Sequence, residues 1–137
     1  MKKLIAVFAL IVLVACSQMP STKNNFSKTI VGTWYFDEQN PDGSRSYFEK
    51  TYKADGTASG YMTDTVIDAL GVKKVLSRTE FTSRWRIEEN MLFITDAAYS
   101  DGTKIEKILD KILEITKEKS VLQSVDTGDI LIRYRKK

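Results

Sequence analysis

The sequence predicts an all-β protein, a small barrel of eight antiparallel strands that follow one another up and down. Three observations lead to this prediction. Five turn signals recur after residue 30, and three of them contain Asp-Gly. The runs between the signals are rich in Val, Ile, Thr, Tyr, Phe and Trp, which suit strands. The runs number eight, and eight strands can close on themselves so that no strand edge stays unpaired.

The turn signals set the expected strand boundaries. Asp-Gly between apolar-rich runs favours a hairpin, because glycine supplies the positive φ that the turn needs. Alternation is clearest in residues 75–87, where Phe81, Ser83, Trp85 and Ile87 share one face and mostly charged residues share the other. Such alternation is typical of a strand with one buried and one wet face. We expect strands at residues 30–38, 45–54, 57–66, 74–87, 91–97, 103–115, 119–126 and 130–136.

Two segments are ambiguous. Residues 66–73 fit either one helical turn or an irregular loop. In residues 104–115 the apolar side chains recur at helical spacing, whereas a strand places Lys107 and Lys111 on the same face as Leu109. We expect a strand for 104–115, because long hairpins flank it and the barrel needs a partner there.

The N-terminus has the pattern of an export signal. Lys2 and Lys3 precede an apolar run over residues 4–15, which is shorter than the ~20 residues of a membrane-spanning helix. The sequence Leu13-Val14-Ala15-Cys16 resembles the bacterial lipobox. This resemblance implies cleavage before Cys16 and a diacylglycerol on its thiol. The alternative is an ordinary signal with a chance cysteine near its cleavage site.

The expected domain organisation follows from this signal. Residues 1–15 are the lipoprotein signal peptide, residues 16–29 are the lipidated cysteine with a flexible polar tether, and residues 30–137 are the barrel domain. Acyl chains on Cys16 would anchor the domain to a membrane almost permanently. Ser17 follows the cysteine, whereas aspartate there resembles an inner-membrane retention signal of Gram-negative lipoproteins. We therefore expect an envelope protein of the outer membrane, on its periplasmic or surface face.

Composition excludes several kinds of chemistry. The chain has no histidine and one cysteine, so imidazole and free-thiol chemistry and disulfides are not expected. The net charge of +3 includes two lysines of the signal, so we expect no nucleic-acid partner. The carboxylates are scattered, and none stands out as half of a catalytic pair. We expect no metal, no cofactor and no enzymatic activity.

The sequence Gly32-Thr33-Trp34 resembles a family motif. It begins a predicted strand in which Gly32, Trp34 and Phe36 share one face. Lipocalins open their first strand with Gly-x-Trp, and the domain resembles the short lipocalin-like domains of bacterial lipoproteins. The resemblance implies that the Trp34 indole closes the barrel base under an arginine of the last strand, Arg133 or Arg135. A guanidinium over an indole contributes ~0.5–2 kcal/mol. The domain is shorter than a typical lipocalin and shows no C-terminal helix.

An eight-stranded barrel either fills with side chains or holds one small ligand. Large side chains expected to face the interior are Tyr52, Met62, Phe81, Trp85 and Phe93. They either fill the core or form an apolar cup for a fatty acyl chain, an isoprenoid or another hydrophobic molecule. Small residues on the same faces favour a cavity: Ala58, Gly60, Thr79 and Ser83.

The leading expectation is therefore an envelope-anchored lipoprotein that binds a small hydrophobic ligand without transforming it. The alternative is an adaptor or inhibitor module that docks on another envelope protein. Arg78, Arg84 and Arg86 form a basic row on one outer face, either a solvated surface or a contact for an acidic partner. A small hydrolase is a third reading, for which the sequence displays no cleft of paired carboxylates.

Overall fold

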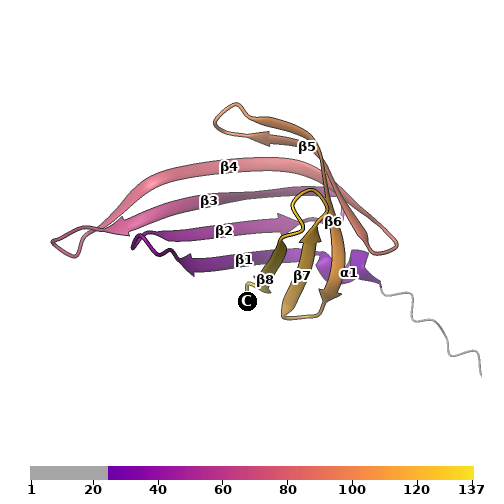
Figure 1. Cartoon of the computed structure of the whole chain (residues 1–137). Helices are drawn as coiled ribbons and strands as arrows, with labels where there is room; N and C mark the ends of the chain where they lie inside the picture. Colours follow the sequence, from indigo (N-terminus) through magenta and orange to yellow (C-terminus); the bar gives the residue numbers. More distant parts are fainter. Residues whose placement is uncertain (1–24) are drawn as a thin grey trace, which may run out of the picture.

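A computed structural model describes residues 25–137, which form a closed antiparallel barrel of eight strands. The strands are adjacent in sequence order, and β8 returns to pair with β1 (Figure 1). The predicted up-and-down barrel of lipocalin-like class is confirmed. The elements are α1 (Phe26–Ile30), β1 (Gly32–Gln39), β2 (Arg45–Tyr52), β3 (Thr57–Ile67), β4 (Lys73–Glu88), β5 (Met91–Tyr99), β6 (Lys104–Ile115), β7 (Lys119–Ser124) and β8 (Ile130–Arg135).

Both ambiguous segments are resolved by pairing. Residues 104–115 are the strand β6, which pairs with β5 on one side and β7 on the other. Ile108 and Ile112 lie on its inner face, whereas Lys107 and Lys111 are exposed. The helical spacing of the apolar residues was therefore misleading, since ladder hydrogen bonds to both neighbours outweigh local preference. Residues 68–72 form the loop of the β3–β4 hairpin rather than a helical turn.

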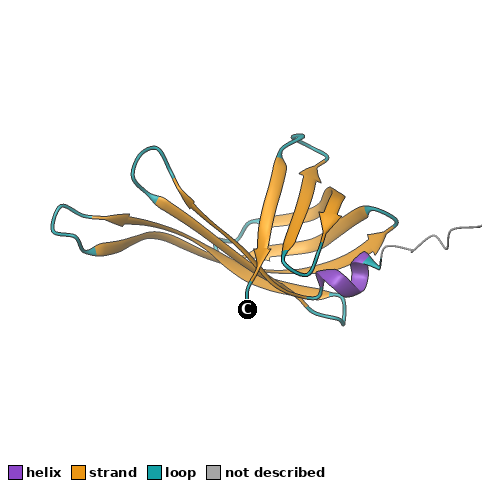
Figure 2. Cartoon of the chain, turned by 90° about the horizontal axis from the view of Figure 1, so that it is seen from below, coloured by secondary structure: helices purple, strands orange, loops and turns teal. Residues whose placement is uncertain are grey.

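The barrel is closed at one end and flares at the other. The seam between β1 and β8 contains two residue pairs, Trp34 with Arg135 and Tyr35 with Tyr134. In contrast, β3 pairs with β4 along its whole length. Because β4 has 16 residues and β8 only 6, the β3–β4 hairpin extends far beyond the closed part (Figures 1 and 2).

Trp34 lies at the closed end and is 1% exposed. Its indole N–H donates to the Ile30 carbonyl at 2.7 Å, and the Arg135 guanidinium carbon lies 4.3 Å from the ring centre. Arg135 also donates to the carbonyls of Lys117 at 2.7 Å and Val31 at 2.9 Å. This one side chain thus links the start of β1 to the β6–β7 turn and covers the indole. Of the two predicted arginines, Arg135 is placed to close the barrel.

Gly32 has a structural reason to be glycine. Its φ is +134°, and a Cβ there would overlap the Arg135 guanidinium. A side chain at this position would therefore be strained and would also displace the arginine from Trp34. The glycine of the Gly-x-Trp motif leaves the space in which the guanidinium lies.

The start of the domain differs from the expectation. Residues 26–30 were predicted as tether and strand, but they form the short helix α1. Ile30 is 1% exposed and Phe26 packs against the same core cluster, so this part of the chain belongs to the barrel base. Contacts of Phe26 and Ile30 with the barrel core hold the helix. The other three residues of the helix are polar, so the sequence gives no local signal for it. The predicted signal peptide, Cys16 and residues 17–24 of the predicted tether lie outside the described residues.

Candidate ligand-binding site

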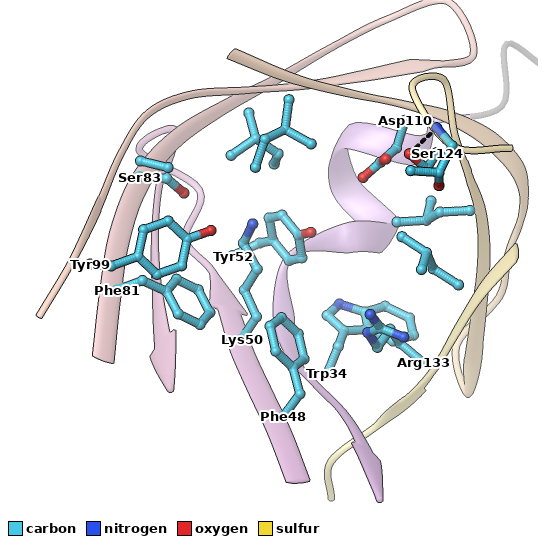
Figure 3. Close-up of a pocket in the computed structure, with 16 residues that line it drawn as sticks. Trp34, Phe48, Lys50, Tyr52, Phe81, Ser83, Tyr99, Asp110, Ser124 and Arg133 are labelled. Atoms are coloured by element: carbon cyan, nitrogen blue, oxygen red, sulfur yellow. Dashed lines mark hydrogen bonds between the residues drawn. The ribbon is translucent and has the colours of Figure 1, made fainter. Parts of the chain in front are cut away.

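The barrel contains a cavity of about 260 Å³ above Trp34 (Figure 3). This volume lies just below the ~300–1,000 Å³ that is usual for small-molecule pockets. Every strand except β3 supplies lining residues, so the cavity exists only once the sheet has closed. The lining residues are Trp34, Phe48, Lys50, Tyr52, Phe81, Ser83, Ile94, Ala97, Tyr99, Ile108, Asp110, Leu122, Ser124, Thr127, Leu131 and Arg133.

One wall of the cavity is aromatic. Phe81 stacks on Phe48 with ring centres 5.5 Å apart and contacts Tyr99 at 5.7 Å. The Phe81 ring lies over Gly60, where a Cβ would come within 2.7 Å of it. Gly60 therefore makes room for the aromatic wall, in agreement with the small residues expected on this face.

Two of the five predicted ligand-binding residues line the cavity, and a third supports one of them. Tyr52 and Phe81 line it, and both are mostly buried. Trp85 packs edge-on against Tyr52 with ring centres 5.7 Å apart, but it does not line the cavity. Its indole N–H donates to the carbonyls of Lys53 and Thr57, so Trp85 supports Tyr52 from behind.

Met62 and Phe93 do not line the cavity. Met62 is on the inner face of the sheet, as is Phe48, its partner on β2. Met62 is 37% exposed, because β3 runs on past the closed part of the barrel. Phe93 lies between the buried Leu92 and Ile94 and so faces outward, where the Arg86 guanidinium carbon lies 4.2 Å from its ring centre. The prediction of an inward Phe93 is wrong because it followed residue type and ignored the alternation of its neighbours.

Lys50 is a charged residue inside the barrel that the sequence analysis missed. It is only 9% exposed, and its Nζ lies 4.9 Å from the Tyr52 ring centre and 5.8 Å from that of Phe81. No hydrogen bond or ion pair within residues 25–137 involves this ammonium group. Burial lowers the Lys50 pKa to about 8. The alternation of side chains along β2 could have predicted this position, because Lys50 lies on the same face of the strand as Phe48 and Tyr52.

Asp110 is a second charged residue of the cavity that the sequence analysis did not predict. It is 7% exposed, its Oδ1 has no hydrogen-bond partner, and burial raises its pKa. The Ser83 hydroxyl is likewise buried without a partner. Unpartnered buried polar atoms cost ~1–3 kcal/mol each, so they are rare unless another molecule satisfies them.

Arg133 faces the cavity and does not cover Trp34, which corrects its predicted role in barrel closure. Its guanidinium carbon lies 4.4 Å from the Phe36 ring centre and 4.9 Å from that of Phe48. It donates one hydrogen bond, to the Ile132 carbonyl. Burial lowers its pKa. Since β1 and β8 pair at only two positions, Arg133 covers aromatic rings of β1 and β2 beside that short seam.

The outer basic row is mostly balanced by acids. Arg78 forms an ion pair with Glu80 at 3.2 Å and Arg86 with Glu88 at 2.8 Å, all on β4 and all exposed, and Arg84 is exposed between them. Such exposed pairs contribute little to stability. Residues 25–137 contain no group of three or more potential metal-ligating side chains. No helix in that part of the chain is long and apolar enough to span a bilayer.

The site is therefore an amphipathic cavity rather than an apolar cup. Aromatic and aliphatic side chains form most of its wall, while Lys50, Asp110 and Arg133 bring charge into the interior. No family model matches the chain, and no curated protein matches it.

Proposed function

We propose that the protein is an envelope-anchored lipoprotein whose lipocalin-like barrel binds one small, partly hydrophobic molecule without transforming it. The observation that carries this proposal is the cavity of about 260 Å³, whose wall includes the Lys50 ammonium without a hydrogen-bond or ion-pair partner in residues 25–137. A barrel that served only as a scaffold gains nothing from such a group, because an unpartnered charge in the interior weakens the fold. A ligand with both apolar and polar parts would satisfy it.

The anchor is the second part of the proposal. It rests on the lipobox-like Leu13-Val14-Ala15-Cys16 and the apolar run before it. A diacylglycerol on Cys16 would hold the barrel at the membrane, where small amphiphiles are abundant.

Native mass spectrometry of the full chain extracted from bacterial envelopes tests both parts. We expect a mature chain that begins at Cys16 and carries a diacylglycerol mass, together with a non-covalent adduct that is released when the protein unfolds. Ala97→Leu should abolish the adduct because Ala97 lines the cavity. Ala98→Leu, one residue away on the opposite face, is the matched control and should keep it. An unmodified Cys16 contradicts the anchor, and an adduct that survives Ala97→Leu contradicts binding in the cavity.

A second candidate function is that of a protein-binding adaptor or inhibitor, and the β3–β4 hairpin favours it. The hairpin extends well beyond the closed barrel (Figures 1 and 2). A protein rarely exposes so many large aliphatic side chains together unless something binds them. We propose that they insert into an apolar groove of another envelope protein. Their exposed fractions are Ile67 66%, Leu70 88%, Val72 54%, Val75 63% and Leu76 61%.

Site-directed photo-crosslinking in living cells tests this docking. A photo-reactive residue in place of Leu70 should give one discrete crosslinked product, whereas the same residue in place of Glu106, exposed on β6, should give none. The double substitution Val75→Ser and Leu76→Ser should remove the product. No product at position 70, or equal products at both positions, would contradict a specific partner at the hairpin.

A further inference from the structure

We propose that the cavity selects short amphiphiles with a single negative charge at one end, and that the Lys50 ammonium and the Arg133 guanidinium bind that charge. This inference rests on the proposed ligand-binding function and names the class of ligand. A medium-chain carboxylate is the simplest molecule of this class.

The first argument is the charge balance of the cavity wall. Its charged side chains are two cations, Lys50 on β2 and Arg133 on β8, and one acid, Asp110 on β6. With all three ionised, the wall carries one uncompensated positive charge. A buried charge is stable only with a partner, because water no longer solvates it. One anionic group would complete the balance.

The second argument is the supply of unused hydrogen-bond donors. The Lys50 ammonium has three donors and no acceptor within the described chain. The Arg133 guanidinium has five donors and gives one hydrogen bond, to a backbone carbonyl. The Tyr99 hydroxyl points toward the Lys50 ammonium, whereas the Tyr52 hydroxyl lies on the far side of its ring from Lys50 (Figure 3). A carboxylate accepts hydrogen bonds through both oxygens, and charge-assisted bonds of this kind are the strong ones.

The third argument is the apolar remainder of the wall. Beyond the charged groups and the aromatic wall, most of the lining is aliphatic, and Trp34 lies at the closed end (Figure 3). This part favours a hydrocarbon chain, and the volume of about 260 Å³ limits the chain to a short one. The aliphatic lining residues are Ile94, Ala97, Ile108, Leu122 and Leu131.

The position of Lys50 also makes the binding sensitive to pH. Lys50 is faced by Phe81 from β4, Asp110 from β6 and Arg133 from β8, as well as by Tyr52 of its own strand. Burial and the nearby Arg133 charge lower its pKa to about 8, while Asp110 opposes this shift. Lys50 therefore loses its proton between pH 7 and 9, and the affinity for an anion should fall over this range.

Isothermal titration calorimetry on the full chain in lipid nanodiscs, with empty nanodiscs as the blank, tests the inference. At pH 7 we expect octanoate to bind at least about tenfold more tightly than octanol or octylamine, a difference of about 1.4 kcal/mol. Binding of octanol or octylamine as tight as that of octanoate would leave ligand binding intact and overturn the charge selectivity. Binding of none of the three would contradict the proposed function itself.

Substitutions test whether Lys50 and Arg133 cause the preference for octanoate. Lys50→Met and Arg133→Met should each abolish the preference for octanoate, whereas Lys107→Met, on the outer face of β6, should keep it. Asp110→Asn removes the carboxylate that opposes the lowering of the Lys50 pKa, so the loss of octanoate affinity with rising pH should begin at a lower pH than in the natural chain. Lys50→Met removes a buried charge, so its melting temperature should equal or exceed that of the natural chain. An unchanged preference in a folded Lys50→Met variant would overturn the assignment.

Discussion

Trp34→Ala is expected to lower the free energy of unfolding by about 3–5 kcal/mol, the range for a fully buried aromatic residue. The indole is 1% exposed and fills the closed end of the barrel. Its loss leaves a void and removes the surface on which the Arg135 guanidinium lies. It also leaves the Ile30 carbonyl without its 2.7 Å hydrogen bond. Urea unfolding followed by far-ultraviolet circular dichroism measures the effect.

Trp34→Phe is the matched control for this prediction. It keeps most of the buried apolar surface and loses the N–H donor, so its destabilisation should be clearly smaller than that of Trp34→Ala. If Trp34→Ala unfolds within about 1 kcal/mol of the natural chain, the indole does not close the barrel as described. Equal losses for the two variants would place the whole effect in the hydrogen bond.

Gly60→Ala is expected to destabilise the barrel by about 2–3 kcal/mol, at the upper end for an overpacked interior. A Cβ at this position would overlap the Glu49 carbonyl oxygen, and would lie 2.7 Å from the Phe81 ring and 2.9 Å from the Lys50 Cα. Two of these neighbours are backbone atoms of β2, so relief requires β2 and β3 to separate. The same movement would displace Lys50 within the cavity and weaken octanoate binding.

Ser59→Ala provides the comparison for Gly60→Ala. It changes the preceding residue, on the outer face of β3, and should stay within about 0.5 kcal/mol of the natural chain. Thermal and urea unfolding of both variants measure the difference. A Gly60→Ala protein as stable as Ser59→Ala would show that β2 and β3 accommodate the added methyl group, contrary to the close packing described.

Much of the fold was predictable because its signals are local. Asp-Gly turns mark hairpins whatever the rest of the chain does, and Gly43, Gly56 and Gly102 all have positive φ. Helix α1 was not predictable, because contacts of Phe26 and Ile30 with the closed core hold it. For β6 the local signal favoured a helix, and pairing with β5 and β7 overrode it.

The candidate site was predictable only in part. Tyr52 and Phe81 were found because large apolar side chains favour the interior. Lys50 and Arg133 were not assigned to the cavity, since charged side chains are almost always at the surface unless something pairs with them. The inward position of Ala97 was also not predictable from alternation, because it lies three residues after the buried Ile94. A bulge at Asp96, whose φ is +52°, shifts the register of β5 against β4 and turns Ala97 to the interior.

By itself the sequence determined that the chain forms eight strands joined by tight turns, and that Trp34 belongs to a buried first strand. These features depend on neighbouring residues, whose backbone preferences and alternation are local properties. Only the tertiary structure decided that Lys50, Asp110 and Arg133 meet in one cavity. They come from β2, β6 and β8, and only closure of the sheet brings three such distant strands around the same space.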